Sequence, residues 1–269
     1  MGPQFQSRLN PSDLRRIQQG IRQRVDAATR PKKAGQKPIG RVQDLPARKR
    51  RELGDQTVGY VLSVADGHNF FKDFEESHTF RETLDFLKQL YRDAAHNGFK
   101  NSIRAYNLER GSPTAALSQH VLKITRTEGE RPNQFRTEMS TAAKMVIIEA
   151  LQQPVAKNPN ESKAEELGRQ FAAFDLRKIV TRFVENFIGE FVRRTIAKAD
   201  KDQVEQAIQD ALALAQNSAE RIARRAMKKI ERKGQLTDAV EIHKMVTEEL
   251  KALVKTEAAE AQRAPAPEE

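Results

Sequence analysis

The chain of 269 residues contains no cysteine. Disulfides, thiolate metal ligands and cysteine nucleophiles are therefore excluded. Long apolar runs are also missing, since no segment approaches the roughly 18 consecutive apolar residues that mark a membrane-spanning helix. The first residues, MGPQFQSRLNPSD, lack the apolar centre of a secretory signal. We therefore expect a protein without membrane contact, located in the cytoplasm, or in the nucleus if the source is eukaryotic.

Common catalytic signatures are missing too. Glycine is scattered singly, without the Gly-rich loops that bind nucleotide phosphates, and no Gly-x-Ser-x-Gly sequence can form a nucleophile elbow. The sequence therefore predicts a protein that is not an enzyme and that uses no cofactor.

One segment, HNFFKDFEESHTF, keeps a catalytic alternative open. His68, Asp73, Glu76 and His78 are residue types that bind metal ions, and two carboxylates with imidazole could support hydrolysis. Their spacing matches no strong motif such as His-Glu-x-x-His, and four phenylalanines are interleaved with them. A helix or loop that packs its aromatic rings inward is the simpler interpretation, and a metal-dependent hydrolase is the third hypothesis for function.

Positive charge is concentrated at the start of the chain. The net charge is +10, from 47 Lys and Arg against 37 Asp and Glu. Residues 1–51 contain fourteen of the basic residues and three of the acidic ones, so the rest of the chain is nearly neutral. Such asymmetry indicates a basic segment that binds an anionic partner.

The densest part of this block runs from Arg30 to Arg51. Flexible Lys and Arg side chains neutralise phosphates and release counterions, which gives salt-sensitive binding without base specificity. Phe5 is the only aromatic residue before Tyr60, so stacking on single-stranded bases is not expected. The predicted nucleic-acid contacts in this block are Arg30, Lys32, Lys33, Lys37, Arg41, Arg48, Lys49, Arg50 and Arg51.

Other interpretations of the block stay open. It could dock on an acidic protein, or be a solvated tail with no partner. Lys32-Lys33, followed after fourteen residues by Arg48-Lys49-Arg50-Arg51, also resembles a bipartite nuclear-localisation signal.

Apolar residues recur at helical spacing through most of the chain, which predicts an all-α protein. We expect a basic, largely disordered leader over 1–51, with one short helix that begins at Ser12 and has a thin apolar stripe. A small helical domain follows over 52–152, in which residues 57–67 fit a strand as well as a helix. Residues 153–162, rich in Pro and Asn, form the expected linker.

The strongest helical pattern lies beyond this linker. We expect a long antiparallel helical bundle over 163–261 and a disordered tail over 262–269. Its first helix, from Leu167 to Ile196, is apolar over much of its circumference and should be central. Phe183, Phe187 and Phe191 are its predicted core residues, and they could extend into an oligomer interface.

A second basic group lies near the end of the next helix. Such a face can lie along a phosphate backbone, although a solvated face paired with Glu220 and Glu231 is the alternative. Five cations share an arc of roughly 100°, namely Arg221, Arg224, Arg225, Lys228 and Arg232.

These features favour a non-enzymatic helical subunit of a larger assembly. In the leading hypothesis, the bundle binds protein partners or further copies of itself, and the basic arm binds nucleic acid nonspecifically. The second hypothesis is a protein–protein adaptor whose basic arm docks on an acidic partner.

Overall fold

The structure, a computed structural model of the chain, describes residues 5–30, 41–108, 111–128, 131–132, 134–156, 158–199, 206–234, 236 and 238–263. Within these residues the fold is all-α, as the sequence predicts. The α-helices are α1 (Pro11–Thr29), α2 (Ala47–Asp66), α3 (Phe70–Glu76), α4 (His78–Asn97), α5 (Lys100–Tyr106), α6 (Pro113–Ile124), α7 (Arg136–Leu151), α8 (Lys163–Ala173), α9 (Leu176–Ala199), α10 (Gln206–Arg232) and α11 (Ala239–Arg263). Two short 3₁₀ helices, η1 (Phe5–Arg8) and η2 (Val42–Asp44), and one antiparallel pair of two-residue strands, β1 (Thr127–Glu128) and β2 (Arg131–Pro132), complete the described elements.

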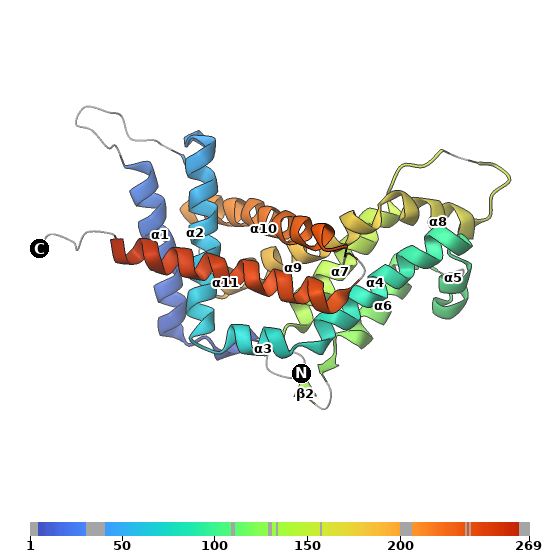
Figure 1. Cartoon of the computed structure of the whole chain (residues 1–269), viewed down its shortest axis with the longest axis horizontal. Helices are drawn as coiled ribbons and strands as arrows, with labels where there is room; N and C mark the ends of the chain where they lie inside the picture. The colour runs from blue at the N-terminus through green and yellow to red at the C-terminus, as the bar shows by residue number, and fades with distance from the viewer. Residues whose placement is uncertain are drawn as a thin grey trace, which may run out of the picture.

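The molecule is elongated (Figure 1). Helices α1 and α2 lie side by side at one end, and α5 and α8 lie at the other, while α9, α10 and α11 cross the middle. Among the helices of the described ranges, none combines the length and the apolar character needed to cross a membrane.

Helix α9 is the centre of the core, in contact with α1, α4, α7 and α10. The predicted core residues Phe183, Phe187 and Phe191 are at most 1% exposed. Phe187 stacks on Phe74 with ring centroids 5.1 Å apart, and Phe191 lies 4.6 Å from Phe70. Because these rings pack inside one chain, they are not available for the oligomer interface that the sequence allowed.

The expected helix from Leu167 to Ile196 is interrupted, which corrects the sequence-based prediction. Asp175 has a left-handed backbone (φ 64°) between α8 and α9. Its carboxylate accepts a hydrogen bond from the backbone N–H of Arg177 at 3.0 Å, which satisfies one free donor at the start of α9. Aspartate tolerates the left-handed region better than most residues, so a short polar side chain ends one helix and begins the next.

The short helix expected in the leader is present as α1, although its cap differs from the predicted one. Asn10, rather than Ser12, caps α1: its side-chain oxygen accepts from the backbone N–H groups of Ser12 and Asp13, both at 2.9 Å. Asp13 in turn accepts from the backbone N–H of Asn10 at 3.1 Å, which completes a capping box.

The apolar residues of this segment pack into the core. Phe5 is fully buried and its ring stacks on Phe135, with centroids 5.5 Å apart. Ile17, Ile21 and Val25 of α1 are at most 5% exposed. The thin stripe is sufficient because α2, α9 and α10 all contact α1. Helix α1 therefore packs within the chain and does not depend on an external partner.

Residues 41–51 are folded as well. Val42 and Leu45 are buried, and η2 contacts both α1 and α10. Helix α2 continues through residues 57–66, which settles the ambiguity between strand and helix. In the described residues, the basic block is thus part of the folded body rather than a detached arm, and Lys32, Lys33 and Lys37 lie outside these residues.

Two glycines let α2 approach the C-terminal helices closely. A Cβ atom at Gly54 would lie 2.6 Å from the backbone oxygen of Leu214 in α10, and one at Gly59 would lie 3.1 Å from that of Leu253 in α11. The hydrophobic core is continuous across the expected linker at 153–162. The two expected domains therefore pack together as one body.

Candidate nucleic-acid interface

Four consecutive cations, Arg48 to Arg51, occupy the first turns of α2. Pro46 stands at the N-cap, where no side chain accepts from the free N–H groups, and the first turn contains no acidic residue. The partial positive charge of the helix start adds to the side-chain charges. This arrangement lowers the stability of the helix by about 0.3–1 kcal/mol for each cation close to its end. This end of α2 is therefore strongly electropositive.

Helix α10 presents the second group of cations. Its apolar side is buried against α9 and α2, which turns the opposite side to solvent. Arg224, Arg225, Lys228 and Arg232 are exposed, and Arg221 is half-buried. The helical spacing thus places all five predicted cations on one accessible side.

Arg221 joins the two groups. Its guanidinium donates to the backbone carbonyl of Arg51 at 3.0 Å and to the Oδ1 of Asp55 at 2.8 Å. Ser218 also donates to Asp55, so the carboxylate receives two bonds from α10. Arg51 and Arg221 are 170 positions apart in the sequence, and sequence reasoning missed the role of Asp55. The only local signal was an acidic residue four positions after Arg51 in a basic run.

We call this combined area the basic surface. It consists of Arg48, Lys49, Arg50 and Arg51 of α2 and Arg221, Arg224, Arg225, Lys228 and Arg232 of α10.

Carboxylates pair with only some of these cations. Arg48 pairs with Glu52 at 2.8 Å, Arg224 with Glu220, and Arg225 with Glu249 at 3.0 Å, in addition to the Arg221–Asp55 pair. Across the part of the chain that the structure describes, the other five cations of the basic surface have no ion pair: Lys49, Arg50, Arg51, Lys228 and Arg232. Of the two carboxylates named in the alternative of a solvated, paired face, Glu220 pairs with Arg224, whereas Glu231 pairs with Arg177 of α9.

Two of the existing pairs are weak. The side chain of Arg48 is 90% exposed and that of Arg224 is 69% exposed. Ion pairs this exposed contribute about 0–1 kcal/mol, because water screens the attraction. A phosphate group can therefore compete with Glu52 or Glu220 at little cost.

The other residues that the sequence predicted to bind nucleic acid lie near the ends of α1 and η2 or outside the described residues. Arg30 ends α1 and Arg41 precedes η2, and both are exposed. Lys32, Lys33 and Lys37 lie outside the described residues, so the structure does not place them relative to α2 or α10.

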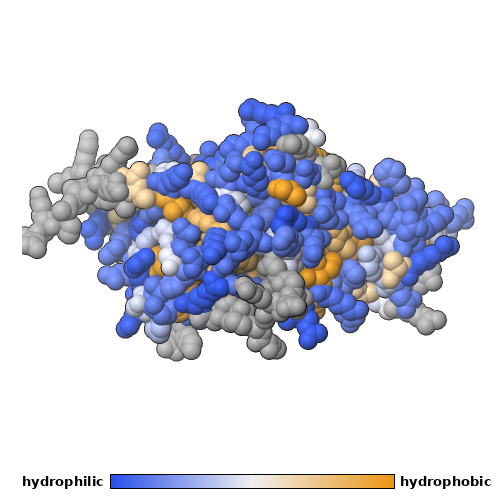
Figure 2. Space-filling view, turned by 60° about the horizontal axis from the view of Figure 1, so that its bottom comes forward, coloured by the Kyte–Doolittle hydropathy of each residue, from blue (hydrophilic) through white to orange (hydrophobic). Residues whose placement is uncertain are grey.

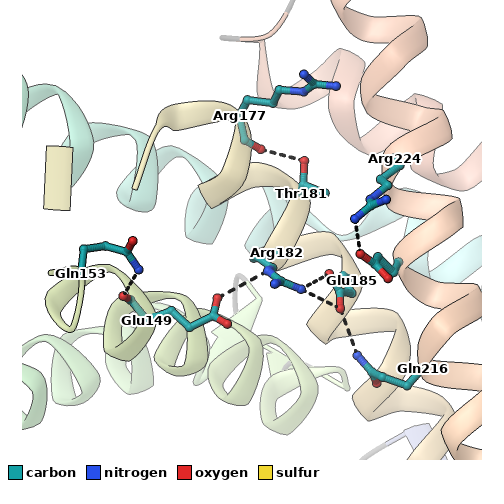
Figure 3. Close-up of polar contacts among 9 residues, drawn as sticks. Glu149, Gln153, Arg177, Thr181, Arg182, Glu185, Gln216 and Arg224 are labelled. Carbon is teal, nitrogen blue, oxygen red and sulfur yellow. Dashed lines mark hydrogen bonds and ion pairs between the residues drawn. The ribbon is translucent and has the colours of Figure 1, made fainter. Parts of the chain in front are cut away.

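A polar network holds α7, α9 and α10 together on the side of α10 that faces α9 (Figure 3). Arg182 of α9 lies between Glu185, at 2.9 Å, and Glu149 of α7, at 3.6 Å. Gln216 of α10 donates to Glu185 at 3.4 Å. Burial disfavours the charge of Arg182, but the hydrogen bonds and charges of Glu185 and Glu149 outweigh it and raise its pKa. Arg182 is therefore paired with carboxylates of α7 and α9 and adds no free cation.

A groove that contains several carboxylates borders the basic surface. The groove lies between α2, α10 and α11, and Arg225 is its only cationic lining residue. Its carboxylates are Glu52, Asp55, Glu249 and Glu257. Each of these carboxylates has a cationic partner: Glu52 pairs with Arg48, Asp55 with Arg221, Glu249 with Arg225 and Lys229, and Glu257 with Arg24.

The four residues of the metal-site hypothesis are not brought together. The Nε2 of His68 lies 2.8 Å from Asp13, and Asp73 pairs with Arg8. His78 contacts Arg81 at 2.7 Å, and Glu76 is exposed. Within the described ranges, no group of three or more potential ligands could hold a metal ion. Phe70, Phe71, Phe74 and Phe80 are buried, as the packing interpretation predicts.

Comparison of the chain with protein-family models, with curated proteins and with solved structures finds no match. The functional argument therefore depends on the geometry of the basic surface.

Proposed function

We propose that the protein is a non-enzymatic helical binding subunit whose basic surface contacts the phosphate backbone of nucleic acid without base specificity. The observation that carries this proposal is the contact of Arg221 with Arg51 and Asp55. It combines two basic segments that are far apart in the sequence into one surface on α2 and α10.

The folded setting of these cations supports binding by a preorganised surface. A flexible arm loses backbone freedom when it binds, at about 1–2 kcal/mol for each residue that becomes ordered. Here the helices already fix the backbone of Arg48–Arg51 and Arg221–Arg232. The five cations without carboxylate partners supply the charge that displaces counterions from phosphates.

A salt series tests the proposal. The full-length protein is titrated onto a labelled 24-base-pair duplex between 50 and 200 mM KCl, and fluorescence anisotropy gives Kd. The test variant replaces Arg51, Lys228 and Arg232 by Gln, since these cations are exposed and have no carboxylate partner that the change would leave alone. Each lost phosphate contact lowers the slope of log K against log salt by about 0.9, so the slope should fall by up to about 2.7.

The matched control replaces three exposed cations at the opposite end of the molecule, Arg92, Lys100 and Arg104, by Gln. It removes the same charge but should keep the slope of the unmodified protein. Equal slopes for the test variant and the control would reject the basic surface. If the unmodified protein does not bind duplex at 50 mM KCl but an acidic protein co-purifies stoichiometrically, the adaptor hypothesis is correct instead.

A further inference from the structure

The phenylalanine side chains of this protein are buried. The sequence has 13 phenylalanines and no tryptophan. All 13 phenylalanine side chains lie in the described residues, and none is more than 5% exposed. Phenylalanine therefore supplies no ring on which a nucleic-acid base could stack.

The three tyrosines are also unsuited to stacking on the basic surface. Tyr60 of α2 donates its hydroxyl to the carbonyl of Arg16 at 2.9 Å, and the guanidinium of Arg24 covers its ring at 3.9 Å from the centroid. Tyr91 lies on α4, and Tyr106 of α5 packs against the ring of His120. The basic surface is thus rich in cations and has no available aromatic ring.

This combination discriminates between forms of nucleic acid. Proteins that bind single strands gain about 1–3 kcal/mol per base from aromatic stacking, and this gain is not available here. The density of phosphate charges along the nucleic acid then decides whether duplex or single strand binds more tightly. The stripe from Arg221 to Arg232 is about 16 Å long. Over that length a duplex carries about nine phosphates, and one of its strands carries about half as many.

Resting on the proposed function, we infer that the basic surface selects duplex over single-stranded nucleic acid, and that it recognises the duplex backbone of DNA and RNA without regard to sequence. Most of the face shown in Figure 2 is hydrophilic, and apolar residues form only small separate patches on it. The phosphate array of two paired strands is the ligand, and the bases do not contact the protein.

Separate titrations with different forms of nucleic acid test this inference. Anisotropy titrations at one salt concentration compare a 24-base-pair DNA duplex, the corresponding RNA duplex, and the single strands dT24, dA24 and U24. The expected result is a Kd at least ten-fold lower for both duplexes than for any single strand, with the two duplexes within a few-fold of each other. Single strands that bind as tightly as the duplexes, or dT24 and dA24 that differ strongly, would overturn the inference. Absence of binding to every probe would instead reject the proposed function.

A gain-of-function variant provides the complementary test. Ala47 is exposed in the first turn of α2, beside Arg48, so Ala47→Trp adds a stacking ring to the basic surface. Its affinity for dT24 should rise about five-fold or more, while the affinity for duplex changes little. The control Ala95→Trp adds the same ring at an exposed position of α4 and should change neither affinity. If Ala47→Trp binds duplex normally but shows no gain for dT24, missing aromatic rings do not explain the preference and the inference fails.

Discussion

Acidification should destabilise the fold through His243, which α11 places inside the aromatic core. The imidazole is 4% exposed. Its ring lies 4.6 Å from that of Phe74 and 4.8 Å from that of Phe80, measured between centroids. Burial and then the positive charge of Arg81 lower the pKa of His243 from 6.5 to about 4, although the backbone of Phe74 and the charge of Glu75 partly oppose the shift.

The magnitude follows from this difference in pKa. Because the folded pKa is below the unfolded value, the unfolded chain takes up the proton first as the pH falls. The free energy of unfolding should therefore decrease as the pH falls from 6.5 to about 4. Each pKa unit corresponds to 1.36 kcal/mol, so the full loss is about 3 kcal/mol. By pH 5 about 2 kcal/mol should already be lost.

Urea denaturation followed by circular dichroism measures this effect. The variant His243→Phe keeps an aromatic ring in the cluster but cannot be protonated. The unmodified protein should lose about 2 kcal/mol more than this variant between pH 7.5 and pH 5. His96→Gln, a change at an exposed position of α4, is the control and should behave like the unmodified protein. The reasoning would be refuted if the His243→Phe variant showed the same pH dependence as the unmodified protein. It would also be refuted if NMR titration gave a pKa near 6.5 for His243.

Two further predictions concern the packing of the N-terminal segment. Phe5→Ala should lower the free energy of unfolding by about 3–5 kcal/mol, because Phe5 is fully buried against Phe135 and Phe70; an unchanged urea midpoint would show that residues near the N-terminus do not belong to the core. Gly54→Ala should destabilise the protein by about 1–3 kcal/mol, since the added Cβ meets the Leu214 backbone at 2.6 Å. Helix propensity alone predicts that the same change stabilises the protein by about 1 kcal/mol. The sign of the measured change in stability therefore shows whether the contact with Leu214 or helix propensity dominates.

Much of the fold could be predicted from local patterns. The spacing of Phe183, Phe187 and Phe191 places them on one side of a helix, and the surrounding apolar residues make that helix central. The five cations of α10 share a side for the same geometric reason. These properties depend only on the helical repeat, which the sequence displays directly.

Other features depend on contacts that local patterns do not contain. Ile17, Ile21 and Val25 form too thin a stripe for an isolated helix, and only the contacts with α2, α9 and α10 explain why α1 is folded. The interruption at Asp175 occurs within an apolar series that otherwise fits one continuous helix. Long-range contacts and single capping residues thus outweigh the local periodicity at these positions.

The candidate site, too, could be predicted from the sequence only in part. Each of its two basic segments could be recognised in the sequence as a dense group of cations. Their combination depends on Arg221 reaching across to Arg51 and on Asp55 holding it there, a contact between residues far apart in the chain. Charge counting alone therefore favoured a detached arm, whereas the structure places Arg48–Arg51 on a folded helix beside α10.

Lysine footprinting tests the basic surface most directly. The full-length protein is acetylated with and without saturating 24-base-pair duplex, and mass spectrometry measures the modification of each lysine. Bound duplex should reduce the acetylation of Lys49 and Lys228 several-fold and leave Lys72 of α3 and Lys100 of α5 unchanged. Protection confined to Lys32, Lys33 and Lys37, with Lys49 and Lys228 unaffected, would show that a separate basic segment binds the duplex and would contradict a surface built from α2 and α10.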